Sequence, residues 1–251
     1  MEVIIVGIHS IAEALRNNDR IVRRLYATEE GLSELRKKGE LKKEFLDRVQ
    51  VKLFSPHKLQ EEAKSEYKRL DFHYTRVPSG VFLLAEDLED EDFSWVMNEM
   101  TKKENLRILC LDQVTDVHNA AAIMRTACFY GVDAIIVSTK GNFGKAPSFS
   151  RIASGALEHV KIVKCASLPK TITKLQKAGF TCVGFSEHEK NEAKELPNEN
   201  LCLVLGAEDV GLSNAVMRSL DKVVAFKTKG AIKSLNVSVA AAVAMEKFFT
   251  V

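Results

Sequence analysis

Short runs of apolar and β-branched residues alternate along the chain with segments whose apolar residues recur every three or four positions. The runs predict strands, and the segments between them predict helices. In the first part of the chain, strands are predicted at residues 3–6, 23–27, 49–54 and 79–85, and helical segments at residues 10–17 and 31–48. This alternation is typical of a small α/β domain.

The same alternation returns after residue 106, with strands that are apolar almost throughout. These strands are predicted at residues 107–111, 133–138, 180–185, 201–205 and 222–226, with helices at 119–130, 168–178, 212–220 and 236–249. Strands without polar alternation belong to a sheet that is covered on both faces, as mostly parallel sheets are. We therefore predict an α/β fold in this part of the chain too.

Charge divides the chain into three parts. Residues 1–86 carry 16 basic and 14 acidic residues, residues 87–105 carry 2 and 7, and residues 106–251 carry 18 and 13. We predict an N-terminal domain, an acidic connector and a C-terminal domain over these ranges. A short amphipathic helix around Trp95 and Val96 would make the connector a packed element, and a flexible linker is the alternative.

Composition narrows the class of protein. The 251 residues are 46% hydrophobic, which excludes a disordered chain, and the net charge of +2 means that nucleic acid must be bound by a local basic face. No basic leader or apolar run of about 20 residues is present, so we expect a cytoplasmic protein without a membrane partner.

Five scattered cysteines without a CxxC pair indicate a reducing compartment and argue against a disulfide framework or a metal site: Cys110, Cys128, Cys165, Cys182 and Cys202.

The common fingerprints of dinucleotide-binding proteins, P-loop proteins and α/β-hydrolases are missing from the chain. Open parallel sheets bind ligands at the carboxyl ends of their strands, so the residues that follow each strand are the candidates. After residues 107–111, Asn119 and Arg125 lie six positions apart, and Asn119 could cap the helix that carries Arg125. A capped helix with a surface arginine is the plain alternative, and His118 is more simply a solvated or capping residue than a base.

Two further loops follow predicted strands. Gly206 and Gly211 flank Glu208 after residues 201–205, in a turn that would let a ligand approach the backbone. An ordinary strand-to-helix turn is the alternative. After residues 222–226 comes a basic loop followed by polar residues that open a helix, which suits either phosphate contact or plain solvation. Its lysines are Lys227, Lys229 and Lys233, and its polar residues are Ser234 and Asn236.

In this order and spacing, the three segments resemble the motif set of the SpoU/TrmH family of RNA ribose 2′-O-methyltransferases. The segment LDQVTDVHNAAAIMRTACFYGVDAII is similar to the first motif, LVLGAEDVGLSNAV to the second and KGAIKSLNVSVAAAVAMEKF to the third. The resemblance covers residues 106–249. More weakly, the opening IVGIHSIAEALRNNDRIVRRLYATEE resembles the small substrate-binding domain of family members that methylate ribosomal RNA, a domain similar to ribosomal protein L30e.

The resemblance implies S-adenosylmethionine as the cofactor, a homodimer without metal, and a C-terminal α/β methyltransferase domain that forms a deep trefoil knot. The family's cofactor-binding positions fall on Gly206, Phe226 and Leu235. Its catalytic positions fall on Arg125, Asn119, Glu208, Ser234 and Asn236. The chain departs from the family pattern at Val117, Ala121 and the segment Phe226, Lys227 and Thr228, which puts details of the substrate and cofactor pocket in question.

The implied function is methylation of a ribose 2′-hydroxyl, with a guanosine of 23S ribosomal RNA as the expected target. Transfer RNA is the alternative substrate, and a non-catalytic RNA-binding ribosome-assembly factor is the alternative from another class. The family assigns the counterpart of Arg125 as the general base. A free guanidinium stays protonated, so a competing role is bidentate positioning of the phosphate and the hydroxyl.

Overall fold

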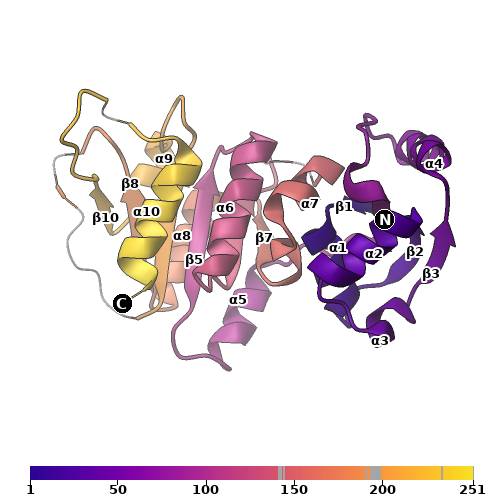
Figure 1. The fold of residues 1–251 in the computed structure, drawn as a ribbon. Coiled ribbons are helices and arrows are strands. Elements are labelled where there is room, and N and C mark those ends of the chain that lie inside the picture. Colours follow the sequence, from indigo (N-terminus) through magenta and orange to yellow (C-terminus); the bar gives the residue numbers. More distant parts are fainter. Residues whose placement is uncertain (141–142, 144, 190, 193–198, 233, 251) are drawn as a thin grey trace. The chain divides into compact units, whose positions relative to one another are not determined.

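The computed structural model describes the chain except residues 141–142, 144, 190, 193–198, 233 and 251. Contacts divide the chain into two compact units (Figure 1). The first contains residues 1–89 and 144–158, and the second contains residues 90–143 and 159–251. The segment 144–158 thus packs with the first unit, whereas the sequence placed it inside the C-terminal domain. Hydrophobic periodicity indicates which residues are buried but not which unit they pack against, so it could not predict this placement.

The first unit is built on a four-stranded sheet in the order β1-β4-β2-β3. Strands β1 (Glu2–Val6) and β2 (Val22–Ala27) both run antiparallel to β4 (Val81–Glu86), and β3 (Gln50–Leu53) runs parallel to β2. The four strands confirm the predicted ones: β1 and β4 are apolar almost throughout, whereas β2 and β3 combine β-branched or aromatic residues with charged ones.

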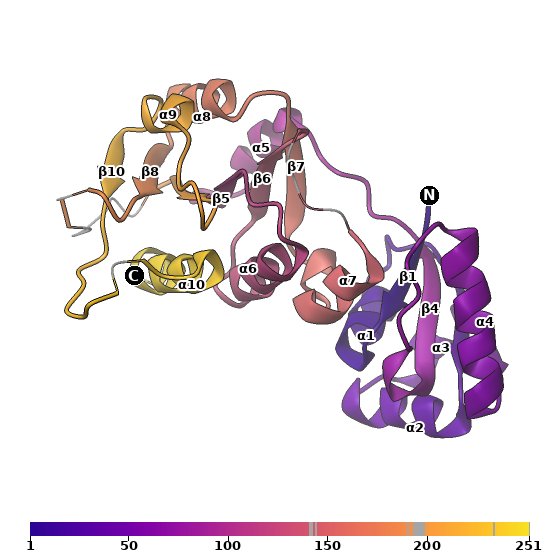
Figure 2. The ribbon, with the colours of Figure 1, turned by 90° about the horizontal axis from the view of Figure 1, so that it is seen from above.

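Helices cover both faces of this sheet. Helices α1 (Ile8–Arg16), α2 (Glu29–Lys38) and α3 (Lys43–Leu46) bury Leu15, Leu35 and Leu46 against one face, and α4 (Pro56–Arg69) buries Leu59 and Tyr67 against the other (Figure 2). Helix α4 was not predicted, because only three of its fourteen residues are buried and the rest are polar. Ser55 starts it by accepting a hydrogen bond from the amide of Lys58.

The helical segment predicted at residues 31–48 is broken into α2 and α3. Between the two helices Glu40 has a left-handed backbone (φ 48°), and the amide of Leu41 donates to the carbonyl of Arg36 at 3.2 Å. This arrangement is a Schellman-type helix end, which stops α2. The prediction of one continuous helix was wrong, because charged residues on both sides of the break have good helix propensity.

Helix α7 (Pro147–Ala153) and the short turn Ala156–Glu158 complete the first unit. The hydroxyl of Ser10 donates to the carbonyl of Ser150 at 2.6 Å, and Arg20 and Glu158 form a buried ion pair at 3.7 Å. Desolvation lowers the pKa of Arg20, and the carboxylate of Glu158 opposes that effect. These contacts hold the segment 144–158 in the first unit.

The second unit is built on a six-stranded sheet in which all strands are parallel, in the order β10-β8-β9-β5-β6-β7. This confirms the predicted α/β class with a mostly parallel sheet. The strands are β5 (Arg107–Asp112), β6 (Ala134–Ser138), β7 (Lys161–Cys165), β8 (Thr181–Phe185), β9 (Leu201–Gly206) and β10 (Lys222–Val224). Strand β7 was not predicted, because two lysines interrupt its apolar residues.

Helices also cover both faces of this sheet (Figure 2). The helices on one face are α5 (Phe93–Met100), α8 (Leu168–Lys177) and α9 (Asn214–Met217), and those on the other are α6 (Val117–Phe129) and α10 (Val237–Phe249). Helix α5 is the amphipathic helix considered for the acidic connector, and its Val96 is fully buried. None of the helices in the described ranges has the length and hydropathy that crossing a bilayer requires.

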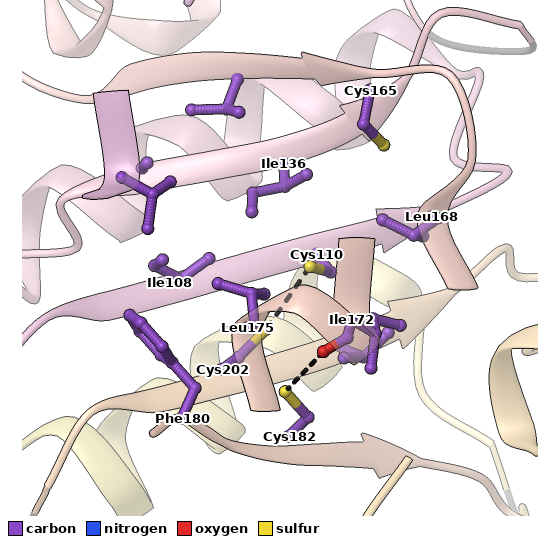
Figure 3. Packing of buried hydrophobic residues seen from close by; sticks show 14 of the residues in the cluster. Ile108, Cys110, Ile136, Cys165, Leu168, Ile172, Leu175, Phe180, Cys182 and Cys202 are labelled. Carbon is purple, nitrogen blue, oxygen red and sulfur yellow. Dashed lines mark hydrogen bonds between the residues drawn. The ribbon is translucent and has the colours of Figure 1, made fainter. Parts of the chain in front are cut away.

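Cysteines pack in the core of the second unit (Figure 3). Cys110 and Cys202 lie on neighbouring strands with their sulfur atoms 3.4 Å apart, and Cys182 lies on the next strand. A hydrogen bond with Cys110 and burial hold the pKa of Cys202 well above its usual range. All five cysteines are free thiols, and four of them are buried, as expected of small hydrophobic core residues.

Candidate functional site

Three loops meet at the carboxyl ends of the parallel strands of the second unit. They follow β5, β9 and β10, which are the strands that precede the three motif segments. Because all strands of the sheet run in the same direction, their carboxyl ends share one edge and side chains distant in sequence come together there. The three segments that carry the candidate residues therefore start at one edge of the sheet.

Three candidate residues, one from each segment, form a hydrogen-bonded group. Asn236 donates from Nδ2 to Oε2 of Glu208 at 2.9 Å and to Oδ1 of Asn119 at 3.0 Å. The Nδ2 atom of Asn119 lies 3.5 Å from the same carboxylate oxygen of Glu208. The two amides thus fix the orientation of one carboxylate at the surface of the second unit.

Capping interactions explain how two of these side chains are positioned. Asp116, not Asn119, caps α6, and its carboxylate accepts from the backbone amide of Asn119 at 2.7 Å. This leaves the side chain of Asn119 available to the group. Asn236 is the N-cap of α10, where its Oδ1 accepts from the amide of Ser238 at 2.9 Å while its Nδ2 donates to the group.

The departures from the family pattern on α6 leave the helix intact. Val117 occupies the first helical position, where proline is also favoured because that amide has no partner within the helix. Ala121 is fully buried and helical. Neither residue prevents α6 from presenting Asn119 to the group.

Arg125 lies on α6 but is not brought into the group. Six positions along a helix place its side chain about 120° around the axis from Asn119. Its side chain is exposed and has no hydrogen bond or ion pair with any residue that the structure describes. The guanidinium is therefore available to a ligand, although the fold does not join it to Glu208.

A pocket of about 400 Å³ opens beside the group. Phe185 and Phe226 stack with their ring centroids 4.9 Å apart and form one wall. Glu208 and Ser234 also line the pocket, together with the predicted cofactor positions Gly206, Phe226 and Leu235. Ser186, Glu187 and His188, at the end of β8, line it too. Sequence reasoning missed these three residues, because the loop after β8 carries none of the recognised motifs.

Gly206 lines the pocket and packs closely against the backbone of the loop that follows it. A Cβ atom on this residue would lie 2.1 Å from the backbone carbon of Gly211 and 2.3 Å from the amide nitrogen of Leu212. Backbone atoms cannot move aside as a flexible side chain can, so glycine is required here. The loop 206–212 is consequently closed tightly against the end of β9.

Asp112 is a buried site residue that sequence reasoning missed. It ends β5, and its Oδ2 accepts from the amide of Ser213 at 2.7 Å. Ser213 in turn caps α9 by accepting from the amide of Val216. The carboxylate thus ties the loop that carries Glu208 to the strand that precedes Asn119. An acidic residue at the end of an otherwise apolar strand was the available signal.

The lysines of the third loop differ in their surroundings. Lys227 lines the pocket and lies 3.6 Å from Glu192 in an exposed ion pair. Lys229 also lines the pocket and is exposed, and Lys233 lies outside the described residues. The described residues bring no three His, Cys, Asp or Glu side chains together as a metal ion would require.

Comparison with known proteins identifies both parts of the chain. Residues 106–246 match the SpoU rRNA methylase family, and residues 4–66 match the family described as RNA 2′-O ribose methyltransferase substrate binding. A Staphylococcus aureus protein assigned to the TrmH family of tRNA/rRNA methyltransferases is 32% identical over 183 residues, which are 72% of this chain and 74% of that protein. A Staphylococcus epidermidis protein with the same assignment is 28% identical over 250 residues, which are 99% of this chain and 95% of that protein.

Solved structures share the fold. The SpoU methyltransferase AviRb from Streptomyces viridochromogenes, in complex with the cofactor AdoMet, has a TM-score of 0.74 at 23% identity, covering 98% of this chain and 88% of that one. The family match over residues 106–246 includes the loops that carry Asn119, Glu208 and Asn236. The chain belongs to the SpoU rRNA methylase family.

Proposed function

We propose that this chain transfers a methyl group from S-adenosylmethionine to a ribose 2′-hydroxyl of RNA, and that its target is a guanosine of 23S ribosomal RNA. The observation that carries the proposal is the group of Asn119, Glu208 and Asn236 beside a pocket of about 400 Å³. Ligand pockets of small molecules have about 300–1,000 Å³. A carboxylate held by two amides next to such a pocket suits a reaction that needs an aligned hydroxyl.

The residues of the pocket fit S-adenosylmethionine. The wall of Phe185 and Phe226 offers apolar contact to a nucleobase, and the side chain of Leu235 extends that surface. The absence of a side chain at Gly206 lets the loop 206–212, which lines the pocket, pack closely against the end of β9. AviRb, with which this chain shares its fold, has been crystallised with AdoMet. Bound S-adenosylmethionine would supply a methyl group that its sulfonium already activates.

The chain itself must therefore align the 2′-hydroxyl and allow one proton to leave. A free guanidinium is protonated at neutral pH, so a general base is a demanding role for Arg125. We assign Arg125 to binding the RNA phosphate and the hydroxyl, with the proton leaving to phosphate or water. Its exposure and lack of a partner among the described residues support this role. Asn119 and Asn236 orient Glu208, and Ser234 completes the polar wall.

The first unit favours ribosomal RNA over transfer RNA as the substrate. Its residues 4–66 match a substrate-binding family, and a separate recognition module suits a structured loop within a large RNA. Methyl transfer from radiolabelled S-adenosylmethionine to size-separated ribosomal and transfer RNA, taken from cells lacking this protein, tests the proposal. We expect label in ribosomal RNA. Label in transfer RNA alone would show that transfer RNA is the substrate. Absence of both label and cofactor binding would favour a non-catalytic RNA-binding factor.

The lysines of the third loop are proposed to contact RNA phosphates. Each phosphate contact contributes about 0.7–0.9 to the slope of log affinity against log salt concentration. Replacing Lys227, Lys229 and Lys233 by Gln should reduce this slope by about 2, measured by fluorescence anisotropy with labelled RNA over a salt series. An unchanged slope would leave these residues as a solvated loop.

We propose that the chain is a homodimer with a deep trefoil knot in its C-terminal domain, and that it works in the cytoplasm. The apolar surface of the neighbouring helices α6 and α10 supports the dimer. Phe129 is 82% exposed, Val239 47% and Val243 40%. Exposed apolar residues gathered on adjacent helices are typical of a protein interface.

Charged residues on this surface should separate the subunits. The double variant Val239→Asp, Val243→Asp should sediment as a monomer under conditions in which the wild type sediments as a dimer, because each carboxylate would lose its hydration in the interface. Leu53→Asp is a matched control, since Leu53 is equally exposed but lies on β3 of the first unit. A double variant that remains dimeric would place the interface elsewhere.

A further inference from the structure

A strongly basic turn lies in the first unit, in a part of the sequence outside all three motif segments. Residues 36–43 read RKKGELKK and carry five basic residues and one acidic residue: Arg36, Lys37, Lys38, Lys42, Lys43 and Glu40. We call these residues the α2–α3 corner. By comparison, α4 carries four basic and three acidic residues over fourteen positions. The corner is therefore a local concentration of positive charge in a chain whose net charge is only +2.

The backbone of the corner brings its two basic clusters together. The amide of Leu41 donates to the carbonyl of Arg36 at 3.2 Å, and Glu40 takes the left-handed conformation that this closure needs. The chain thus folds back at the end of α2, and Lys42 follows directly after the closing bond. Arg16 ties the corner to α1, because its Nη2 donates to the carbonyls of Gly39 and Glu40 while its Nη1 pairs with Glu13.

The cations of the corner are exposed and largely unpaired. The side chains of Arg36, Lys37 and Lys43 have no hydrogen bond or ion pair with any residue in the described part of the chain. Lys38 pairs with Glu34, and Lys42 lies 3.9 Å from Glu44, but both pairs are exposed to solvent. Exposed pairs of this kind contribute little free energy and exchange readily for another anion.

Favourable interaction with a helix end explains only some of the cations in the α2–α3 corner. Cations in the last turn of α2, such as Lys37, interact favourably with the partial negative charge at a helix C-terminus. Lys42 and Lys43 stand instead at the start of α3, which is a single turn of four residues, so a helix dipole does not account for their charge. Their positive charge has no evident role in helix stability.

We propose that the α2–α3 corner binds the phosphate backbone of the RNA substrate. The corner lies within residues 4–66, which match the family described as RNA 2′-O ribose methyltransferase substrate binding. Side chains of lysine and arginine supply the sequence-independent part of RNA affinity, and a fixed turn presents them together. This inference rests on the proposed function, because it takes RNA as the substrate.

Neutralising the corner tests the proposal. The full-length variant Lys37→Gln, Lys42→Gln, Lys43→Gln should bind a fluorescently labelled RNA hairpin about tenfold more weakly at moderate salt, and its salt slope should fall by about 2. All three side chains are exposed, so the thermal unfolding temperature of the variant should change little. In methyl transfer, KM for RNA should rise while kcat at saturating RNA stays unchanged.

The matched control carries the same change of charge on α4 of the same unit. Lys58→Gln, Lys64→Gln, Lys68→Gln removes three exposed cations that lie among acidic residues, and its salt slope should stay close to that of the wild type. Equal slopes for wild type, corner variant and control would overturn the inference while leaving the proposed function intact. If wild-type protein bound the hairpin but methylated no RNA, the proposed function would fail, and the slopes would still decide whether the corner binds RNA.

Discussion

Arg125→Ala is expected to lower methyl transfer to RNA about a thousandfold, while the affinity for S-adenosylmethionine stays within about twofold of the wild type. The reason is the position of Arg125, which is exposed on α6 and absent from both the pocket lining and the group of Asn119, Glu208 and Asn236. Loss of a guanidinium that positions the nucleophile removes an interaction with the substrate but leaves the cofactor pocket unaltered.

Two measurements separate this role from a structural one. Isothermal titration with S-adenosylmethionine should give the same Kd for the variant, and circular dichroism should give the same unfolding temperature, because Arg125 has no partner among the described residues. Arg125→Lys should recover part of the activity, since a lysine keeps the charge without the bidentate geometry. Turnover at the wild-type rate in Arg125→Ala would contradict the assignment.

Gly206→Ala is expected to abolish measurable binding of S-adenosylmethionine. The new Cβ would lie 2.1 Å from the backbone carbon of Gly211, so the loop 206–212 would have to move away from the end of β9. Overpacking of this kind costs about 1–3 kcal/mol, and the displaced loop carries Glu208 with it. Titration calorimetry with the cofactor, together with thermal unfolding, measures both effects.

A second glycine provides the control. Gly230→Ala adds the same methyl group in the loop after β10, where no atom of the described residues outside its immediate chain neighbours lies within 4 Å of the new atom, and it should bind the cofactor like the wild type. If Gly206→Ala fails to fold, Phe226→Ala tests the same pocket without a backbone clash, because it removes one ring of the stacked wall and should weaken cofactor binding. Wild-type affinity in both Gly206→Ala and Phe226→Ala would place the cofactor elsewhere.

The sequence by itself determined most of the strands and the fold class. Strands such as β5 and β9 are buried and apolar at most positions, so their composition alone predicts that they are buried. Elements with one buried face and many charges were not recognised, and α4 and β7 are examples. In β7, Lys161 and Lys164 pair with acidic residues near the start of α5. No local sequence pattern predicts such partners.

The sequence also indicated the candidate residues, through the order and spacing of three segments, but it could not establish which of them touch. Asn119, Glu208 and Asn236 come together because parallel strands carry their loops to one edge of the sheet. The same folding leaves Arg125 outside this group, on another side of α6. Only the tertiary structure assigned Asp112 to the loop of Glu208, and only it placed residues 144–158 in the first unit, because such contacts join residues far apart in the chain, where local periodicity carries no information.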